Sequence, residues 1–434
     1  MHGPQVYAQR RRDFMRRMDG GVAILRAAPV SVRSHDVEYA FRQDNDFLYL
    51  TGFPEPEATC ILAPGAEQPY TLFVRPRDPE KETWTGRRVG VDGAKTLYGA
   101  DAAYTIDELD TRLPKLVEHA SVVYYAPGRD QRFNTRMFEL FGWARDNHAR
   151  SGAGPRGLLD PGAILHDMRL FKAPEEIEAL ERAIAIAAEA HTSAMRETRP
   201  GAFEYEIEAL IDYTFRRRGA TGPAYPSIVA SGPNATILHY VENTRQMRDG
   251  ELLLIDAGAE YGGYCADVTR TFPVGARYEG RARALYDVVL AAQEAAIATV
   301  RPGASFDEPH QCALEILVDG LRHLGLLEEE RDAAIAGGTY RRFYMHRTSH
   351  WLGMDVHDVG VYRLDDKPRA LAPGMVLTVE PGLYVAPDCE QVAPEWRGIG
   401  IRIEDDVLVT PEGNRVLSAA VPKHVADVEA LRRS

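Results

Sequence analysis

Closely spaced cysteines are missing from this chain of 434 residues. Its four cysteines, Cys60, Cys265, Cys312 and Cys389, are widely separated, and none belongs to a CxxC or CxxxC motif. Structural zinc sites and disulfide-stabilised secreted domains both depend on paired cysteines. The spacing therefore argues against a structural zinc site and favours a reducing compartment, and we expect a cytoplasmic protein.

Long apolar runs and an excess of basic residues are missing as well. No stretch approaches the roughly 20 apolar residues of a membrane span. The arginine-rich residues 1–18 lack the apolar segment of a signal peptide, and we expect them to form a basic amphipathic surface helix. Basic residues number 51 against 64 acidic ones, a net charge of -13. Since phosphate binding needs a basic surface, we expect neither nucleic acid nor a membrane as a partner.

The first part of the chain alternates short apolar runs with helix-like segments, which is typical of an α/β domain. The expected strands are residues 21–27, 58–63, 70–74 and 121–126, and the expected helices are residues 107–119 and 133–149. A polar, glycine-rich stretch and a connector at residues 160–173 follow. We therefore place a domain boundary near Leu170, with domains at residues 1–170 and 171–434.

The second part contains one pattern twice. Helices are expected at residues 174–197 and 203–218, separated by Arg199-Pro200-Gly201. A second pair is expected at residues 278–300 and 306–324, separated by Arg301-Pro302-Gly303. The repetition hints at two related halves, and the chain beyond Phe343 is rich in expected strands.

Two aspartates occur in a predicted β-hairpin around Gly262-Gly263. If the turn is centred between Tyr261 and Gly262, Asp256 and Asp267 lie directly opposite, with Cβ atoms about 5 Å apart. Carboxylates that close repel each other unless a cation or a proton lies between them. The alternative, aspartates that cap turns, explains one such residue better than two.

Three of the 13 histidines, His346, His350 and His357, fall within residues 343–360. A lone histidine is usually structural, but a cluster beside glycines favours a metal site or a proton shuttle. The spacing does not say which of the three would bind metal.

Two more acids follow apolar strands near the C-terminus. Glu380 ends the run at residues 375–379, and Glu404 shares an expected strand face with Arg402. Each has a simpler explanation, an exposed glutamate at a turn and a solvated Arg–Glu pair. Together, four carboxylates and at least one imidazole suit two divalent ions, with Mn²⁺ favoured and Zn²⁺ or Co²⁺ possible.

These segments resemble the pita-bread metallopeptidases, family M24, and most closely the aminopeptidase P members. The resemblance covers nearly the whole chain. It rests on residues 39–58, 84–88, 168–172, 237–240, 255–258, 267–273, 349–353, 356–360, 379–384 and 400–406. It implies an α/β N-terminal domain and an α+β pita-bread catalytic domain. It also implies hydrolysis of the N-terminal Xaa-Pro bond by a bridging hydroxide that two metal ions activate, with peptides carrying proline at the second position as substrates.

The resemblance also implies roles for individual residues. The metal ligands would be Asp256, Asp267, His350, Glu380 and Glu404. Glu380 would take the proton of the bridging water, while His239 and His357 would contact the scissile region and stabilise its oxyanion. The site would be supported by His346 and Arg402, which would also contact substrate, and by Tyr384 in the pocket. Trp84 would reach a neighbouring subunit's active site, which implies a homotetramer, or otherwise a dimer.

The chain departs from the family pattern at two places. The family's His-Gly-Leu-Ser-His becomes His346-Arg347-Thr348-Ser349-His350, and residues 222–235 match weakly. The alternatives are a prolidase, which accepts only dipeptides, and a non-enzymatic pita-bread binding protein. Methionine aminopeptidase, which lacks so long an N-terminal domain, and the metal-free creatinase-like enzymes fit less well.

Overall fold

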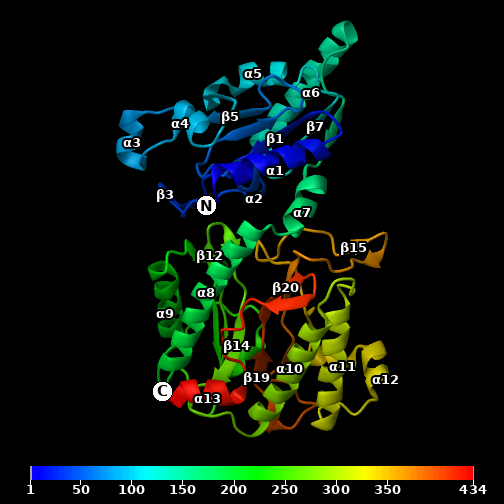
Figure 1. The fold of residues 1–434 in the computed structure, drawn as a ribbon. Coiled ribbons are helices and arrows are strands. Elements are labelled where there is room, and N and C mark those ends of the chain that lie inside the picture. Colours follow the sequence, from blue (N-terminus) through cyan, green and yellow to red (C-terminus); the bar gives the residue numbers. More distant parts are fainter. Residues whose placement is uncertain (1, 434) are drawn as a thin grey trace. The chain divides into compact units, whose positions relative to one another are not determined.

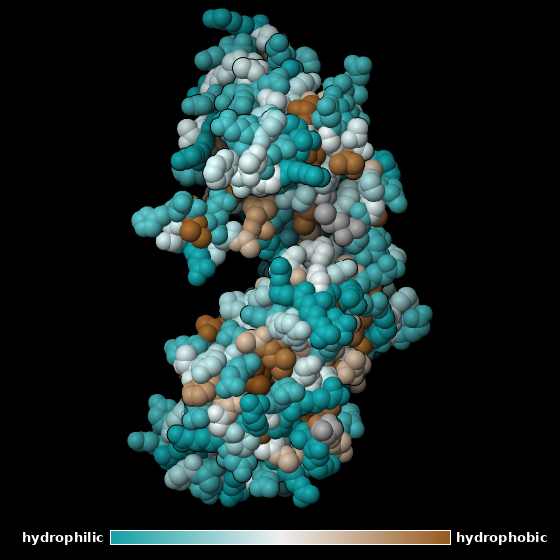
Figure 2. Space-filling model, turned by 90° about the vertical axis from the view of Figure 1, so that its left-hand side faces the viewer, coloured by the Kyte–Doolittle hydropathy of each residue, from teal (hydrophilic) through white to brown (hydrophobic). Residues whose placement is uncertain are grey.

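The computed structural model describes residues 2–433. The chain divides into two compact units, Met1–Met168 and Arg169–Ser434, and each is described by itself (Figure 1). No helix among residues 2–433 combines the length and the apolar character that a bilayer crossing requires. The face drawn in Figure 2 is mostly hydrophilic, and its hydrophobic residues form small separate groups.

The N-terminal unit is built on one mixed sheet of order β6-β5-β4-β1-β7-β8. Its strands are β1 (Val22–Arg26), β4 (Thr59–Leu62), β5 (Tyr70–Val74), β6 (Ala102–Thr105), β7 (Val122–Tyr124) and β8 (Gly157–Leu159), with a separate hairpin of β2 (Val32–Ser34) and β3 (Val37–Glu38). Its helices are α1 (Pro4–Arg17), α2 (Asn45–Thr51), α3 (Pro79–Thr85), α4 (Gly90–Thr96), η1 (Ile106–Glu108), α5 (Leu109–Leu116) and α6 (Gln131–Ser151), and α7 (Gly162–Leu170) leads into the second unit. The four predicted strands and both predicted helices are confirmed. The expected connector at residues 160–173 is wrong in part, because most of it forms α7.

Helix α1 is not the simple surface helix that its composition suggests. Arg10 and Arg11 are buried among its apolar residues. The guanidinium of Arg11 lies 3.8 Å from the centre of the Tyr70 ring, and that of Arg10 lies 4.1 Å from the Tyr49 ring. Aromatic faces attract cations and can accommodate a buried guanidinium, so a count of basic residues misplaces these two side chains.

The C-terminal unit combines small antiparallel sheets with long helices. Its helices are α8 (Pro174–Glu197), α9 (Glu204–Arg217), η2 (Gly232–Thr236), α10 (Gly280–Thr299), α11 (Glu308–His323), α12 (Arg331–Gly337), η3 (Thr339–Arg342), η4 (Pro394–Trp396) and α13 (Val425–Arg433). Its strands are β9 (Gly222–Pro223), β10 (Ile228–Ser231), β11 (Leu252–Asp256), β12 (Ala259–Tyr261), β13 (Tyr264–Cys265), β14 (Thr269–Pro273), β15 (Arg363–Leu364), β16 (Lys367–Pro368), β17 (Val376–Val379), β18 (Gly382–Val385), β19 (Ile399–Arg402), β20 (Asp405–Thr410) and β21 (Gly413–Val416). Figure 1 shows α8 and α9 on one side of the strands and α10 and α11 on the other.

The two helix pairs also make equivalent backbone hydrogen bonds. Gly201 N donates to Met247 O at 2.9 Å, and Gly303 N donates to Leu371 O at 2.8 Å. The next strand of each half then ends at an acid, since Asp256 follows Met247 by nine residues and Glu380 follows Leu371 by nine. The two halves therefore place equivalent carboxylates at the ends of equivalent strands, β11 and β17.

The predicted pairing of Asp256 with Asp267 is wrong by two residues. The turn is Gly262-Gly263, both with positive φ (61° and 86°), as two-residue hairpin turns require. Tyr261 therefore pairs with Tyr264, and Asp256 pairs with Thr269. A shift of two residues keeps every side chain on its face, so Asp256 and Asp267 remain diagonal neighbours.

Candidate metal-binding active site

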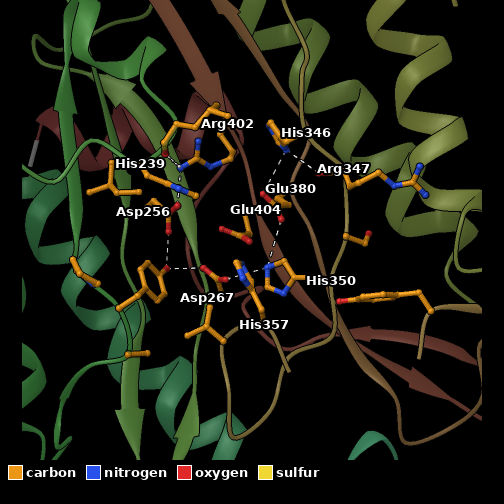
Figure 3. A pocket seen from close by; sticks show the side chains of 18 of the residues that line it. His239, Asp256, Asp267, His346, Arg347, His350, His357, Glu380, Arg402 and Glu404 are labelled. Carbon is orange, nitrogen blue, oxygen red and sulfur yellow. Dashed lines mark hydrogen bonds and ion pairs between the residues drawn. The ribbon is translucent and has the colours of Figure 1, made fainter. Parts of the chain in front are cut away.

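Nine of the eleven predicted site residues converge on one cavity of about 1130 Å³ in the C-terminal unit. It is lined by His239, Asp256, Asp267, His346, His350, His357, Glu380, Arg402 and Glu404, and Figure 3 shows these side chains around it. The other two predicted residues do not line it. Tyr384 is buried behind the lining, and Trp84 belongs to the N-terminal unit, where it is exposed.

The centre of the cavity brings acids against one histidine. Ligand atoms of Asp267, His350 and Glu404 all lie within 4.8 Å of one another. His350 Nε2 is 3.3 Å from Asp267 Oδ2 and 3.5 Å from Glu380 Oε1. Glu380 directly follows β17, Glu404 directly precedes β20, and Asp267 lies in the β11–β14 hairpin. His350 lies in a loop beside β17, where its backbone carbonyl accepts from Thr378 N at 3.0 Å.

Backbone bonds decide which histidine is available as a ligand. His350 Nδ1 is 2.9 Å from Trp351 O. A carbonyl only accepts, so Nδ1 donates and the lone pair of a neutral His350 is on Nε2, which faces the acids. His346 Nδ1 likewise donates to Arg347 O, at 2.8 Å, but its Nε2 accepts from Tyr384 Oη at 2.9 Å. His350 is therefore free to bind a cation, and His346 is occupied.

Tyr225 is a site residue that the sequence did not reveal. Its Oη lies 2.6 Å from Asp256 Oδ1 and 2.6 Å from Asp267 Oδ1. A hydroxyl has one proton, so it can donate to only one of these acids at a time. Tyr225 lies in the weakly matching residues 222–235, between Ala224 and Pro226, and no pattern of charge or period marks it.

The electrostatics of the site call for positive charge. Burial raises the pKa of Glu380 to about 8, and the charge of Asp267 adds to the effect. Burial and neighbouring acids also raise the pKa of Asp256 and Glu404. Although burial alone would lower it, bonding to Asp267 and the charge of Glu380 raise the pKa of His350 to about 9. In the absence of a metal ion, bound protons therefore compensate the negative charge of these acids.

A divalent metal centre fits this donor set. Carboxylate oxygens with one imidazole are the ligands that Mn²⁺, and also Zn²⁺ or Co²⁺, accept. His350 faces the carboxylates of Asp267 and Glu380 (Figure 3), and acids held this close together repel one another unless a proton or a cation lies between them. The residues present thus fit metal binding.

Arg402 orients the acids of the site through hydrogen bonds. It is buried, and its guanidinium donates to Asp256 Oδ2 at 2.6 Å, to Tyr384 Oη at 3.0 Å and to Thr269 Oγ1 at 3.2 Å. Thr269 in turn donates to Glu404 Oε2 at 2.7 Å. The predicted strand does not run through Arg402 and Glu404, because β19 ends at Arg402 and β20 begins at Asp405. Both side chains are buried and line the cavity, so they are not a solvated pair.

His357 belongs to a loop that a buried ion cluster holds. Its ring packs edge-on against His350, with centroids 4.4 Å apart, and burial lowers its pKa. The next residue, Asp358, accepts from Lys172 Nζ at 3.0 Å and from Arg169 at 2.6 Å. All three side chains are at most 3% exposed, so the first residues of the C-terminal unit fix the position of His357.

Replacing Lys172 with methionine should lower the free energy of unfolding by about 3 kcal/mol, because it leaves a buried carboxylate with one partner fewer. The midpoint of urea unfolding measures the change. Arg283→Met is the control, since Arg283 pairs with Asp287 on the exposed face of α10 and such pairs contribute about 0–1 kcal/mol. Equal midpoints for the two variants would show that the cluster does not stabilise the loop.

Comparison with known proteins places the chain in a family. Residues 178–411 match the metallopeptidase family M24, and residues 7–124 match the aminopeptidase P N-terminal domain. The Xaa-Pro aminopeptidase of Escherichia coli is 46% identical, over 98% of this chain and 97% of that one. Human Xaa-Pro aminopeptidase 3 is 37% identical over 93% of this chain and 79% of its own length.

Solved structures agree with the sequence matches. The aminopeptidase PepP of Pseudomonas aeruginosa superposes with a TM-score of 0.97 at 49% identity, covering 100% of this chain and 98% of that one. The low-pH form of aminopeptidase P from E. coli gives a TM-score of 0.96 at 45% identity, with 100% and 99% covered. These matches confirm the predicted fold class, an α/β N-terminal domain followed by an α+β pita-bread domain. The chain belongs to metallopeptidase family M24, as an aminopeptidase P with that family's N-terminal domain, and is an enzyme of the hydrolase class.

Proposed function

We propose that the protein hydrolyses the bond before proline in peptides whose second residue is proline, using two divalent metal ions. The observation that carries the proposal is the cavity that four carboxylates line together with His350, whose Nε2 lies against Asp267 and Glu380. The ions would be held by Asp256, Asp267, His350, Glu380 and Glu404. Mn²⁺ suits this mostly oxygen donor set, with Zn²⁺ and Co²⁺ as alternatives. When bound, the ions supply Lewis acidity, which lowers the pKa of water and neutralises charge near the reacting carbonyl.

The side chains of the cavity divide the remaining work. Glu380 would accept the proton of the attacking water, since its carboxylate lies at the centre of the cavity beside His350 and a well-placed carboxylate can act as a general base. His357, with its lowered pKa, is neutral at pH 7 and can donate a hydrogen bond to the carbonyl oxygen as its charge grows. His239 lines the same cavity and would serve the same oxygen or the proline side of the bond.

Arg402, Tyr384 and His346 would act as a linked support. Arg402 donates to Tyr384 Oη, and Tyr384 donates to His346 Nε2. These two hydrogen bonds fix the orientation of Arg402 against Asp256 and hold the ring of His346 at the cavity wall. Arg402 and His346 are the two members that would also contact substrate, because both line the cavity.

A dipeptidase is the second candidate, and the volume of the cavity argues against it. About 1130 Å³ lies above the roughly 300–1,000 Å³ of small-molecule pockets, which leaves room for a peptide that continues beyond proline.

The four cysteines all lie in the described part of the chain, and none of them forms a disulfide. This suits a reducing compartment, and we propose the cytoplasm.

A peptide panel tests the proposed function. With added Mn²⁺, Xaa-Pro-Yaa-Zaa should release its first residue, and Xaa-Ala-Yaa-Zaa should be hydrolysed at least about 100-fold more slowly if the site discriminates the proline ring. Xaa-Pro alone should be a poor substrate. Hydrolysis of Xaa-Pro but not of the longer peptide would favour the dipeptidase, and equal turnover of the alanine peptide would overturn the proposal.

We also propose a homotetramer, or otherwise a dimer, in which Trp84 completes a neighbouring active site. Helix α3 has no buried residue, and its Trp84 is 86% exposed. Tryptophan is enriched in interfaces and seldom left in water. Trp84→Ala should raise KM about 10-fold, and sedimentation of the unchanged protein should give an assembled species. A monomer with full activity would contradict this assignment.

A further inference from the structure

One end of the cavity carries two arginines, Arg347 and Arg363. Figure 3 shows Arg347 directed away from Asp256, with Glu380, Glu404 and His350 lying between the two. Arg347 forms an ion pair with Asp307 Oδ1, and Arg363 Nη1 lies 3.6 Å from Asp307 Oδ2. All three residues line the cavity. Two guanidinium groups thus share one carboxylate at this end.

The neighbouring His310 does not change this excess of positive charge. Burial, and then the charge of Arg347, lowers the pKa of His310 to about 4. Its ring is therefore neutral at pH 7, and the charged side chains at this end are those of Arg347, Arg363 and Asp307.

The side chain of Arg347 is not buried in a structural network. His346 bonds to the backbone carbonyl of Arg347, which any residue would supply. The guanidinium is 59% exposed and Arg363 is 56% exposed, so neither is buried as a support. Asp307 orients the guanidinium of Arg347. At position 347 the family pattern has glycine, whereas this chain has a cationic side chain.

A peptide bound across the site would meet opposite charges at its two ends. Its α-amine carries a positive charge and is attracted to the acids around Asp256. The scissile bond would lie beside Glu380 and His350, in the middle of the cavity. The part beyond proline would then extend toward Arg347 and Arg363. A guanidinium pairs with a carboxylate through two parallel hydrogen bonds.

We propose that Arg347 and Arg363 form an anion subsite that selects Xaa-Pro peptides with a carboxylate on the leaving part. The inference rests on the proposed function and deepens it. The shared chemistry is a carboxylate just beyond proline, and two sources supply it, the free C-terminus of a tripeptide or an acidic side chain in a longer peptide. Arg347 is thus a specificity-determining residue.

Matched substrates test the subsite. One pair is Xaa-Pro-Yaa with a free or an amidated C-terminus, and the other is an amidated longer peptide with Glu or Gln after proline. The unchanged protein should prefer the charged member of a pair by about three- to tenfold in kcat/KM, mainly through KM. Preference in the first pair alone identifies a terminal carboxylate as the ligand, and preference in both identifies any carboxylate at that distance.

Three variants separate charge from shape. Arg347→Gln and Arg363→Gln should each lower the ratio of charged to neutral turnover, and the double variant should bring it close to one. Arg347→Lys keeps the charge without the fork and should retain part of the ratio. Arg283→Gln, on the exposed face of α10, should retain all of it. Salt at 0.5 M should reduce the ratio in the unchanged protein.

The outcomes distinguish the two levels of the proposal. Equal turnover of charged and neutral members by the unchanged protein would overturn the subsite alone. So would a ratio that survives in the double variant. Failure to hydrolyse any proline peptide would overturn the proposed function, and the subsite with it.

Discussion

Asp267→Asn is expected to lower kcat/KM for an Xaa-Pro-Yaa peptide by more than about 100-fold. The loss of a residue that only hydrogen-bonds to a metal ligand already lowers metal affinity or activity by about 10–100-fold. Asp267 lies at the centre of the site. Its Oδ1 accepts from Tyr225, and its Oδ2 faces His350 Nε2 at 3.3 Å. Asparagine has the same size but brings no negative charge, so the fold should persist while the metal content falls.

The comparison needs a folded control with the same substitution. Asp287→Asn changes an exposed carboxylate on α10 and should leave turnover and metal content unchanged. Circular dichroism and the urea midpoint establish that both variants are folded. Full activity in the Asp267 variant would mean that the acids of this cavity do not hold the catalytic metal.

Metal-free protein is expected to lose stability as the pH rises from about 5 to about 9, by on the order of 2–5 kcal/mol. In the folded chain the pKa of Glu380 is about 8, against an ordinary value of 4.5. The folded state therefore binds more protons than the unfolded state between these values, and its stability falls as the pH rises through 8. The pKa of His350, about 9 against 6.5, acts in the same direction, since its contribution is complete below 6.5 and lost through 9.

Urea unfolding at fixed ionic strength, with and without a chelator, measures this dependence. Bound Mn²⁺ should remove most of the slope, because a cation replaces the protons that the acids otherwise hold. Glu380→Gln should flatten the slope of the metal-free protein. A metal-free protein whose stability rises with pH over this range would contradict the charge balance described for the site.

The sequence was sufficient to locate most of the candidate site because its acids adjoin apolar strands. Asp256 ends β11, Glu380 directly follows β17, and Glu404 directly precedes β20. An acid at the end of a buried run is conspicuous in sequence, since burial without a partner is costly. The repeated helix pairs were visible for a similar reason, because proline and glycine interrupt helices in a recognisable way.

Contacts between distant segments were out of reach. The choice of His350 over His346 depends on a hydrogen bond from Tyr384, and the bridging hydroxyl of Tyr225 comes from a segment without a pattern. The hairpin register was missed by two residues because the exact position of a glycine turn decides it. Arg10 and Arg11 were misplaced because the aromatic rings that receive them, Tyr49 and Tyr70, lie elsewhere in the chain.

The binding of metal itself is the most direct test. Calorimetric titration of metal-free protein with Mn²⁺ should saturate at about two ions per chain, the stoichiometry of a two-metal site. Saturation at two ions would mean that Asp256, Asp267, His350, Glu380 and Glu404 share their charge with a cation pair. The account would be contradicted if the unchanged protein released no more heat than the Asp267→Asn variant and still hydrolysed peptides.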